Sequence, residues 1–133
     1  MLKYFGLLSL LFSNLVLAGA GGKPVLVCTG KLETDSYALR VLRVTSLTGG
    51  RAGSYIATLE KNGKISKVAN VTPFDKGFSG DYGYQNKQKG LNVSIPHVQL
   101  TDIPTPYARG VVQIWLSDAW LNIRVLCNTQ PVQ

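Results

Sequence analysis

The two cysteines of this chain, Cys28 near its start and Cys127 near its end, put the tightest constraint on how it can fold. An even number of cysteines in an exported protein is typical of a disulfide bond. If these two pair, the bond ties the first strand of the fold to the last. A zinc site would need more ligands than two thiols and the one histidine, His97, can supply. The sequence therefore predicts a Cys28–Cys127 disulfide, with no metal and no cofactor.

The first 20 residues have the order of a secretory signal peptide. Lys3 precedes an apolar run from Tyr4 to Leu17, and small residues suited to signal peptidase end at Ala18 and Ala20. The run is shorter than the membrane-spanning helix of about 20 apolar residues, and no second candidate span follows. We predict that residues 1–20 are cleaved after Ala18 or Ala20 and that residues 21–133 form one domain. This domain is expected to be secreted or periplasmic, without a transmembrane segment.

Short strand-like runs alternate with turn residues through the rest of the chain. Segment 37–45 is apolar on both faces, which suits a barrel or a sandwich better than an open sheet. Asn62-Gly63 lies between two β-rich runs, and this pair is a strong hairpin signal because a type I′ turn needs positive φ at both positions. No segment has a helical period. The pattern predicts an all-β fold, a single small antiparallel β-barrel or β-sandwich of about seven to eight strands.

The final runs, 109–116 and 120–127, are expected to form the last hairpin across residues 117–119. Alternation in the second run predicts two faces of different character. One face carries Leu121, Ile123 and Val125, and the other carries Asn122, Arg124 and Leu126.

Charge indicates the kind of partner that this chain would meet. Lysine and arginine number 14 against 7 aspartates and glutamates, a net charge of +7, but no segment is a continuous basic run. This balance favours a protein partner, an anionic glycan or an anionic surface, or else serves solubility alone. Export makes nucleic acid a poorer expectation.

Catalytic patterns are weak in this sequence. His97 would have to serve any histidine-dependent site, and no recognised nucleophile motif surrounds it. The seven carboxylates are scattered, and most lie in segments typical of turns. The glycines at 77, 80 and 83 are not followed by the helix that a phosphate-binding loop requires. A non-catalytic role is therefore favoured over an enzyme.

Two segments carry the residue types of a recognition surface. Residues 75–90 combine glycines with aromatic and basic side chains, which can stack on a ligand and attract anions. The alternative is an edge strand on which the two tyrosines cover the core. Residues 101–110 form a proline-stiffened loop with side chains enriched in binding hot spots. The candidate binding residues are Phe78, Tyr82, Tyr84, Lys87, Lys89, Tyr107 and Arg109.

These features favour an exported binding module that recognises a glycan, a surface or a protein. Three alternatives remain open at this point. The chain could inhibit a secreted or host hydrolase through loop 101–110, it could be a small hydrolase that uses the scattered carboxylates, or it could be a structural subunit of an envelope. The oligomeric state is also open.

Overall fold

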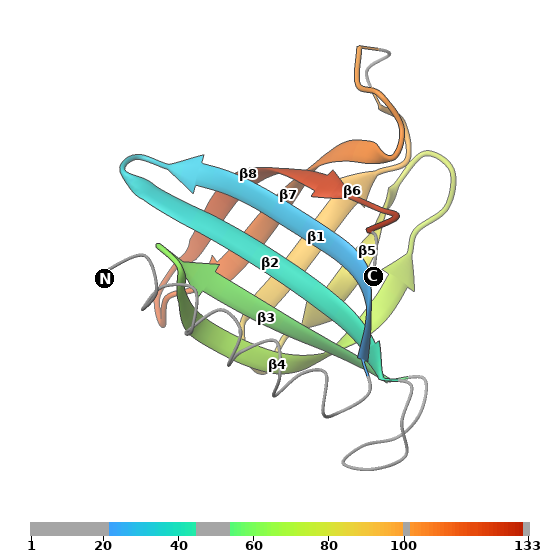
Figure 1. The fold of residues 1–133 in the computed structure, drawn as a ribbon. Helices are drawn as coiled ribbons and strands as arrows, with labels where there is room; N and C mark the ends of the chain where they lie inside the picture. The colour runs from blue at the N-terminus through green and yellow to red at the C-terminus, as the bar shows by residue number, and fades with distance from the viewer. Residues whose placement is uncertain (1–21, 45–53, 100–101, 132–133) are drawn as a thin grey trace, which may run out of the picture.

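The computed structural model describes residues 22–44, 54–99 and 102–131, and this part of the chain contains eight β-strands (Figure 1). In chain order they are β1 (Gly22–Leu32), β2 (Asp35–Val44), β3 (Tyr55–Lys61), β4 (Lys64–Asp75), β5 (Asp81–Asn86), β6 (Leu91–Pro96), β7 (Tyr107–Trp115) and β8 (Trp120–Asn128). The expected signal peptide, residues 1–20, lies outside the described residues. The described segments contain no helix long and apolar enough to cross a bilayer.

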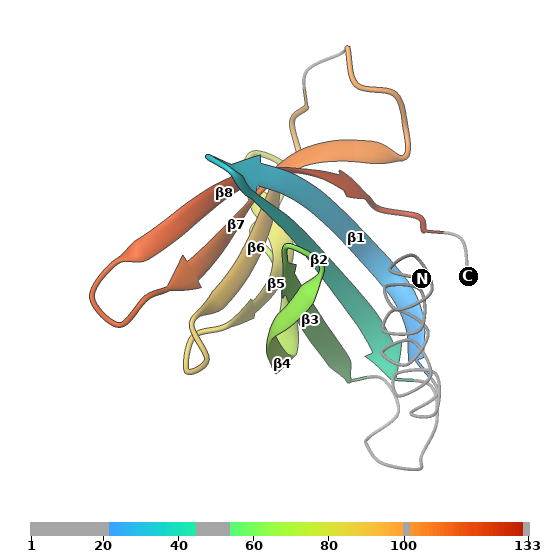
Figure 2. The ribbon, with the colours of Figure 1, turned by 60° about the vertical axis from the view of Figure 1, so that its left-hand side comes forward.

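The strands form a closed barrel in which each strand pairs antiparallel with the next, and β8 returns to pair with β1. In Figure 1, β1–β4 form the wall nearer the viewer and β5–β8 the wall behind it. Because consecutive strands run in opposite directions, their connections alternate between the two ends. The β5–β6 and β7–β8 turns therefore lie at one end, and residues 97–99 and 102–106 lie at the other (Figure 2). The all-β prediction is confirmed, and of its two alternatives the barrel is correct.

Alternating side chains fill the barrel interior. On β6, Leu91, Val93 and Ile95 point inward and are at most 1% exposed. On β8 the predicted faces are confirmed, since Ile123 and Val125 are buried and the residues between them are exposed. Period-2 alternation therefore directs every second side chain of such a strand to the core and the side chains between them to the outer surface.

The Asn62-Gly63 turn joins β3 to β4 as expected. Both residues have positive φ, 53° and 82°, which matches the type I′ requirement. The Asn62 side chain also accepts a hydrogen bond from the Ser36 amide and donates one to Asp35, both at 2.9 Å. Asn62 thus forms part of the β3–β4 turn and also links this turn to the start of β2.

The predicted disulfide is present and lies in the seam between the first and last strands. Cys28 and Cys127 are directly opposed across β1 and β8, and both are fully buried. The seam is short, with Val27–Gly30 paired to Val125–Asn128. The covalent bond therefore lies within the strand pair that closes the barrel.

Two local expectations need correction. Segment 81–86 is not an edge strand, because β5 pairs with β4 on one side and β6 on the other. A closed barrel has no edge strand for it to occupy. Residues 107–110 are not loop either, since β7 already begins at Tyr107. Antiparallel pairing with β8 extends the strand to Tyr107, directly after Pro106.

Candidate functional site: an amide groove on the outer face of β4–β8

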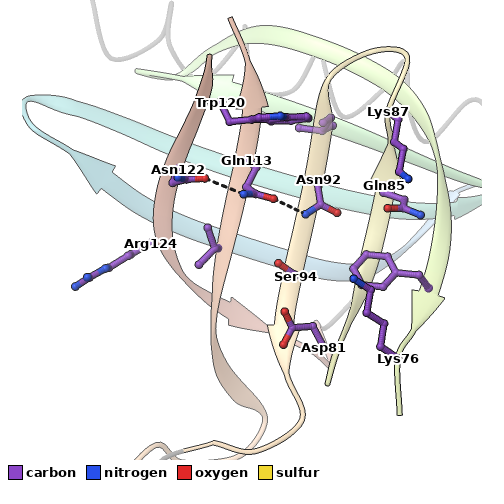
Figure 3. Close-up of a pocket in the computed structure, with 13 residues that line it drawn as sticks. Lys76, Asp81, Gln85, Lys87, Asn92, Ser94, Gln113, Trp120, Asn122 and Arg124 are labelled. Carbon is purple, nitrogen blue, oxygen red and sulfur yellow. Dashed lines mark hydrogen bonds between the residues drawn. The ribbon is translucent and has the colours of Figure 1, made fainter. Parts of the chain in front are cut away.

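Four amide side chains lie at matched positions on four neighbouring strands. Gln85 on β5 is paired with Asn92 on β6, Asn92 with Gln113 on β7, and Gln113 with Asn122 on β8. We call these four residues the amide row. Neighbouring strands lie about 4.8 Å apart, so the row crosses roughly 14 Å of the outer surface. Figure 3 shows the row running across the strands on one face of the sheet.

Hydrogen bonds join three of the four amides into a chain. Asn92 Nδ2 donates to Gln113 Oε1 at 2.9 Å, and Gln113 Nε2 donates to Asn122 Oδ1 at 2.9 Å. A primary amide has two donor hydrogens and an oxygen with two acceptor sites, so each member keeps unused capacity. The chain holds the planes of the three amides in fixed orientations while leaving polar atoms available to a ligand.

Aromatic side chains border the row at the β7–β8 turn. Trp115 and Trp120 are opposite each other on the two strands, with ring centroids 5.4 Å apart, and both are more than 40% exposed. Gly90 makes this arrangement fit, because a Cβ on it would lie 2.4 Å from Trp115 Cβ. A third aromatic side chain, Phe74 on β4, covers Gly83. Flat apolar surfaces therefore flank the amides.

The row is the floor of a groove of about 690 Å³, which we call the amide groove. Three cationic side chains line it, Lys76, Lys87 and Arg124, together with one carboxylate among the described residues, Asp81. Lys76 Nζ lies 5.8 Å from the centroid of the Phe74 ring. The groove is thus polar along its floor and carries an excess of positive charge.

A second, apolar recess of about 940 Å³ adjoins the amide groove and is lined by residues 102–104 together with parts of β7 and β8. Val111 and Arg124 line both hollows. The recess also contains two of the predicted binding residues, Tyr107 and Arg109. Arg109 lies 3.5 Å from Asp102, so its charge is already paired.

The other predicted binding residues are dispersed. Lys87 lines the amide groove, but Phe78 lies in the β4–β5 turn, 92% exposed, and lines neither hollow. Tyr82 and Tyr84 pack against the core, Tyr82 beside His97 and Tyr84 beside Tyr55. Burial raises the pKa of both tyrosines above the ordinary value. Lys89 lies outside both hollows, and its carbonyl accepts a hydrogen bond from Lys67.

His97 is tied to the turn between β4 and β5. Its Nε2 lies 2.8 Å from Asp75 Oδ1, and its backbone N–H donates to Gly80 O at 3.1 Å. The backbone N–H of Gly77 and the His97 ring both contact Asp75, and they hold the pKa of this carboxyl below its usual value. These contacts assign His97 a role in fastening the β4–β5 turn to the end of β6.

The amide row was not among the residues predicted for the site. Alternation along 120–127 did predict Asn122 and Arg124 on one face. The row itself arises from the pairing register of four strands, and the amides of one strand carry no information on that register.

Comparison with known proteins gives no relative from which to transfer a role, because no protein-family model, curated protein or solved structure matches the chain. Among the described residues, no group of three or more His, Cys, Asp and Glu side chains could hold a metal ion. The chemistry of the groove therefore has to be argued from its own side chains.

Proposed function

We propose that this protein is an exported, non-catalytic module that binds an oligosaccharide in the amide groove. The observation that carries the proposal is the cross-strand row of Gln85, Asn92, Gln113 and Asn122. Sugars present neighbouring hydroxyls, each of which both donates and accepts hydrogen bonds. A primary amide presents a donor and an acceptor side by side, so one amide can contact two adjacent hydroxyls.

The hydrogen bonds within the row favour binding because they fix the amides before a ligand arrives. Ordering a long polar side chain on binding costs about 0.5–1.5 kcal/mol. Gln113, which bonds to both neighbours, is already ordered. The row therefore acts as a preformed polar floor.

The surroundings of the row support the same class of ligand. Sugar rings have apolar C–H faces that stack on aromatic side chains, and Trp120 and Phe74 line the groove. A two-carboxylate hydrolase would need a second acidic group facing Asp81. The described lining residues supply no second acidic group, and this favours binding over hydrolysis.

Export is part of the proposal, and it is supported by the signal-like residues 1–20 and by the Cys28–Cys127 disulfide, a bond typical of oxidising compartments. Production in a host with intact secretion should yield a mature chain that begins at Gly19 or Gly21. Mass spectrometry of the exported protein measures this directly, and an uncleaved N-terminus would contradict it.

Binding of the oxidised protein to a panel of immobilised neutral and acidic oligosaccharides tests the function. Titration calorimetry on the retained members then gives affinities. Changing Asn92 and Gln113 together to alanine removes the centre of the row. Each hydrogen bond is worth about 1 kcal/mol, so the affinity should fall by about 10- to 100-fold.

Ser66→Ala with Gln130→Ala is the matched control, because both are exposed polar residues outside the groove. Circular dichroism and melting first establish that all variants fold. The proposal fails if the wild-type protein retains no oligosaccharide, or if both double variants bind as well as the wild type.

A further inference from the structure

The hydrogen-bond chain of the amide row has a direction, and this direction bears on the ligand's charge. Donation runs from Asn92 through Gln113 to Asn122, so the chain ends on the Asn122 oxygen as acceptor. Both hydrogens of Asn122 Nδ2 remain, and no described residue accepts either of them. The β8 end of the row is therefore its donor end.

Arg124 is on the same strand as this donor end, and Figure 3 shows its side chain extending from β8 away from the row. It is two residues along β8 from Asn122, and side chains two apart on a strand share a face. Both side chains line the amide groove. Within the described residues no carboxylate pairs with Arg124, whereas Arg109 is matched by Asp102. A guanidinium fork and an adjacent amide N–H pair are the donors that a carboxylate or sulfate group accepts from.

The opposite end of the row is also positive. Lys87 lies just beyond the end of β5, two residues after Gln85, and Lys76 lies on the same side of the groove, so this end carries two cations (Figure 3). Asp81 forms no ion pair with any of the three cations in the described segments. The floor between the two ends is neutral.

Resting on the function proposed above, we infer that the oligosaccharide is acidic and that the corner formed by Arg124 and Asn122 Nδ2 binds one of its carboxylate or sulfate groups. The amides of Asn92 and Gln113 contact neutral hydroxyls of the same oligosaccharide. Lys87 and Lys76 attract a further acidic group at the β5 end. An uncharged sugar uses the floor alone and leaves the Arg124 corner unmatched.

A matched pair of probes tests this inference. One is a set of uronic-acid oligosaccharides, and the other is the same set after chemical reduction of each carboxyl group to an alcohol. The wild-type protein should bind the acidic set about tenfold or more tightly than the reduced set, and this preference should shrink with salt.

Two substitutions examine the corner itself. Asn122→Asp keeps the oxygen that accepts from Gln113 but replaces the free donor by a negative oxygen. It should abolish the preference for the acidic set, so that the variant binds the acidic set no more tightly than the reduced set. Arg124→Ala should lower affinity for the acidic set by about tenfold. Arg43→Ala removes an equal charge from an exposed position on β2, outside the groove, and should change neither set.

The outcomes separate the inference from the function on which it rests. Equal binding of acidic and reduced sets overturns the acidic ligand and leaves the oligosaccharide module standing. An acidic preference that Arg43→Ala weakens as much as Arg124→Ala overturns the assigned corner, because general charge then accounts for it. If neither probe set nor any other panel member binds, both proposals fail.

Discussion

At the scale of single residues, Gly90 combines a positive φ with a close side-chain contact beside the groove. Its φ of 66° favours glycine, and the space where a Cβ would lie is taken by Trp115. Gly77 offers a comparison, since its φ is 90° but nothing lies within 4 Å of its Cβ position. Comparing an alanine substitution at Gly77 with one at Gly90 therefore separates the cost of backbone strain from the cost of steric overlap.

Gly77→Ala should lower the free energy of unfolding by about 1–2 kcal/mol, because an alanine is strained at positive φ. Gly90→Ala should lower it by about 1–3 kcal/mol more, through overlap with Trp115. Urea denaturation measures both values, and tryptophan fluorescence should shift only in Gly90→Ala. Equal losses in the two variants would mean that Trp115 moves aside freely.

Asp75 gives stability a dependence on pH in the acid range. Hydrogen bonds from Gly77 and His97 lower its pKa in the folded state below the ordinary 3.8. A lowered folded-state pKa contributes stability above the unfolded-state value, and the contribution is lost as pH falls through the folded-state value. The Asp75→Asn variant should therefore have a lower melting temperature than the wild type at about pH 5–7, where this contribution is fully present. The difference in melting temperature should close below pH 3.8. A gap that persists at lower pH would show that ionisation of Asp75 is not its cause.

At the scale of elements, β6 has one face for the core and one for the groove. Ile95 points inward and is fully buried, whereas the next residue toward the N-terminus, Ser94, lines the amide groove. Ile95→Ala should lower the free energy of unfolding by about 2–5 kcal/mol because it leaves a cavity. Ser94→Ala should change it by no more than about 0.5 kcal/mol.

Chemical denaturation followed by circular dichroism measures both losses. A loss for Ser94→Ala as large as that for Ile95→Ala would mean that the outer face is built for stability rather than for a ligand.

Strands and their faces were predictable from the sequence because each needs only local information. Alternation in 120–127 separated the two faces of that strand, and Asn62-Gly63 identified a hairpin. The amide row was not predictable in this way. It depends on the pairing register of four strands, β5 to β8. The connection between β6 and β7 is too long for turn geometry to fix that register.

At the scale of the whole molecule, the disulfide joins residues 99 apart in the sequence and closes the barrel. A crosslink over about 100 residues restricts the unfolded chain, which corresponds to up to about 4.7 kcal/mol. Changing Cys28 and Cys127 together to alanine should lower the free energy of unfolding by about 2–5 kcal/mol. Urea titration of the variant against the oxidised wild type measures this, with reduced wild type as a second reference. A variant as stable as the oxidised protein would mean that the β1–β8 hydrogen bonds alone hold the seam.

The choice between barrel and sandwich could not be made from the sequence. Both folds have short alternating strands, apolar faces and a crosslink between the ends. The pairing of Val27–Gly30 with Val125–Asn128 decides between them, and it joins segments that no local pattern relates.

Closure between the first and last strands also determines when, during folding, the barrel can close. β1 is made before the six strands that follow it, whereas its partner β8 is made after all of them. Any sheet that forms before β8 joins it has an unpaired edge on β1 and an apolar face that β8 does not yet cover, features that promote aggregation. Loss of even a few residues before Asn128 would leave this sheet permanently open, so a truncated product is not a smaller barrel. Pairing of β8 with β1 is thus the step that commits the chain to its fold.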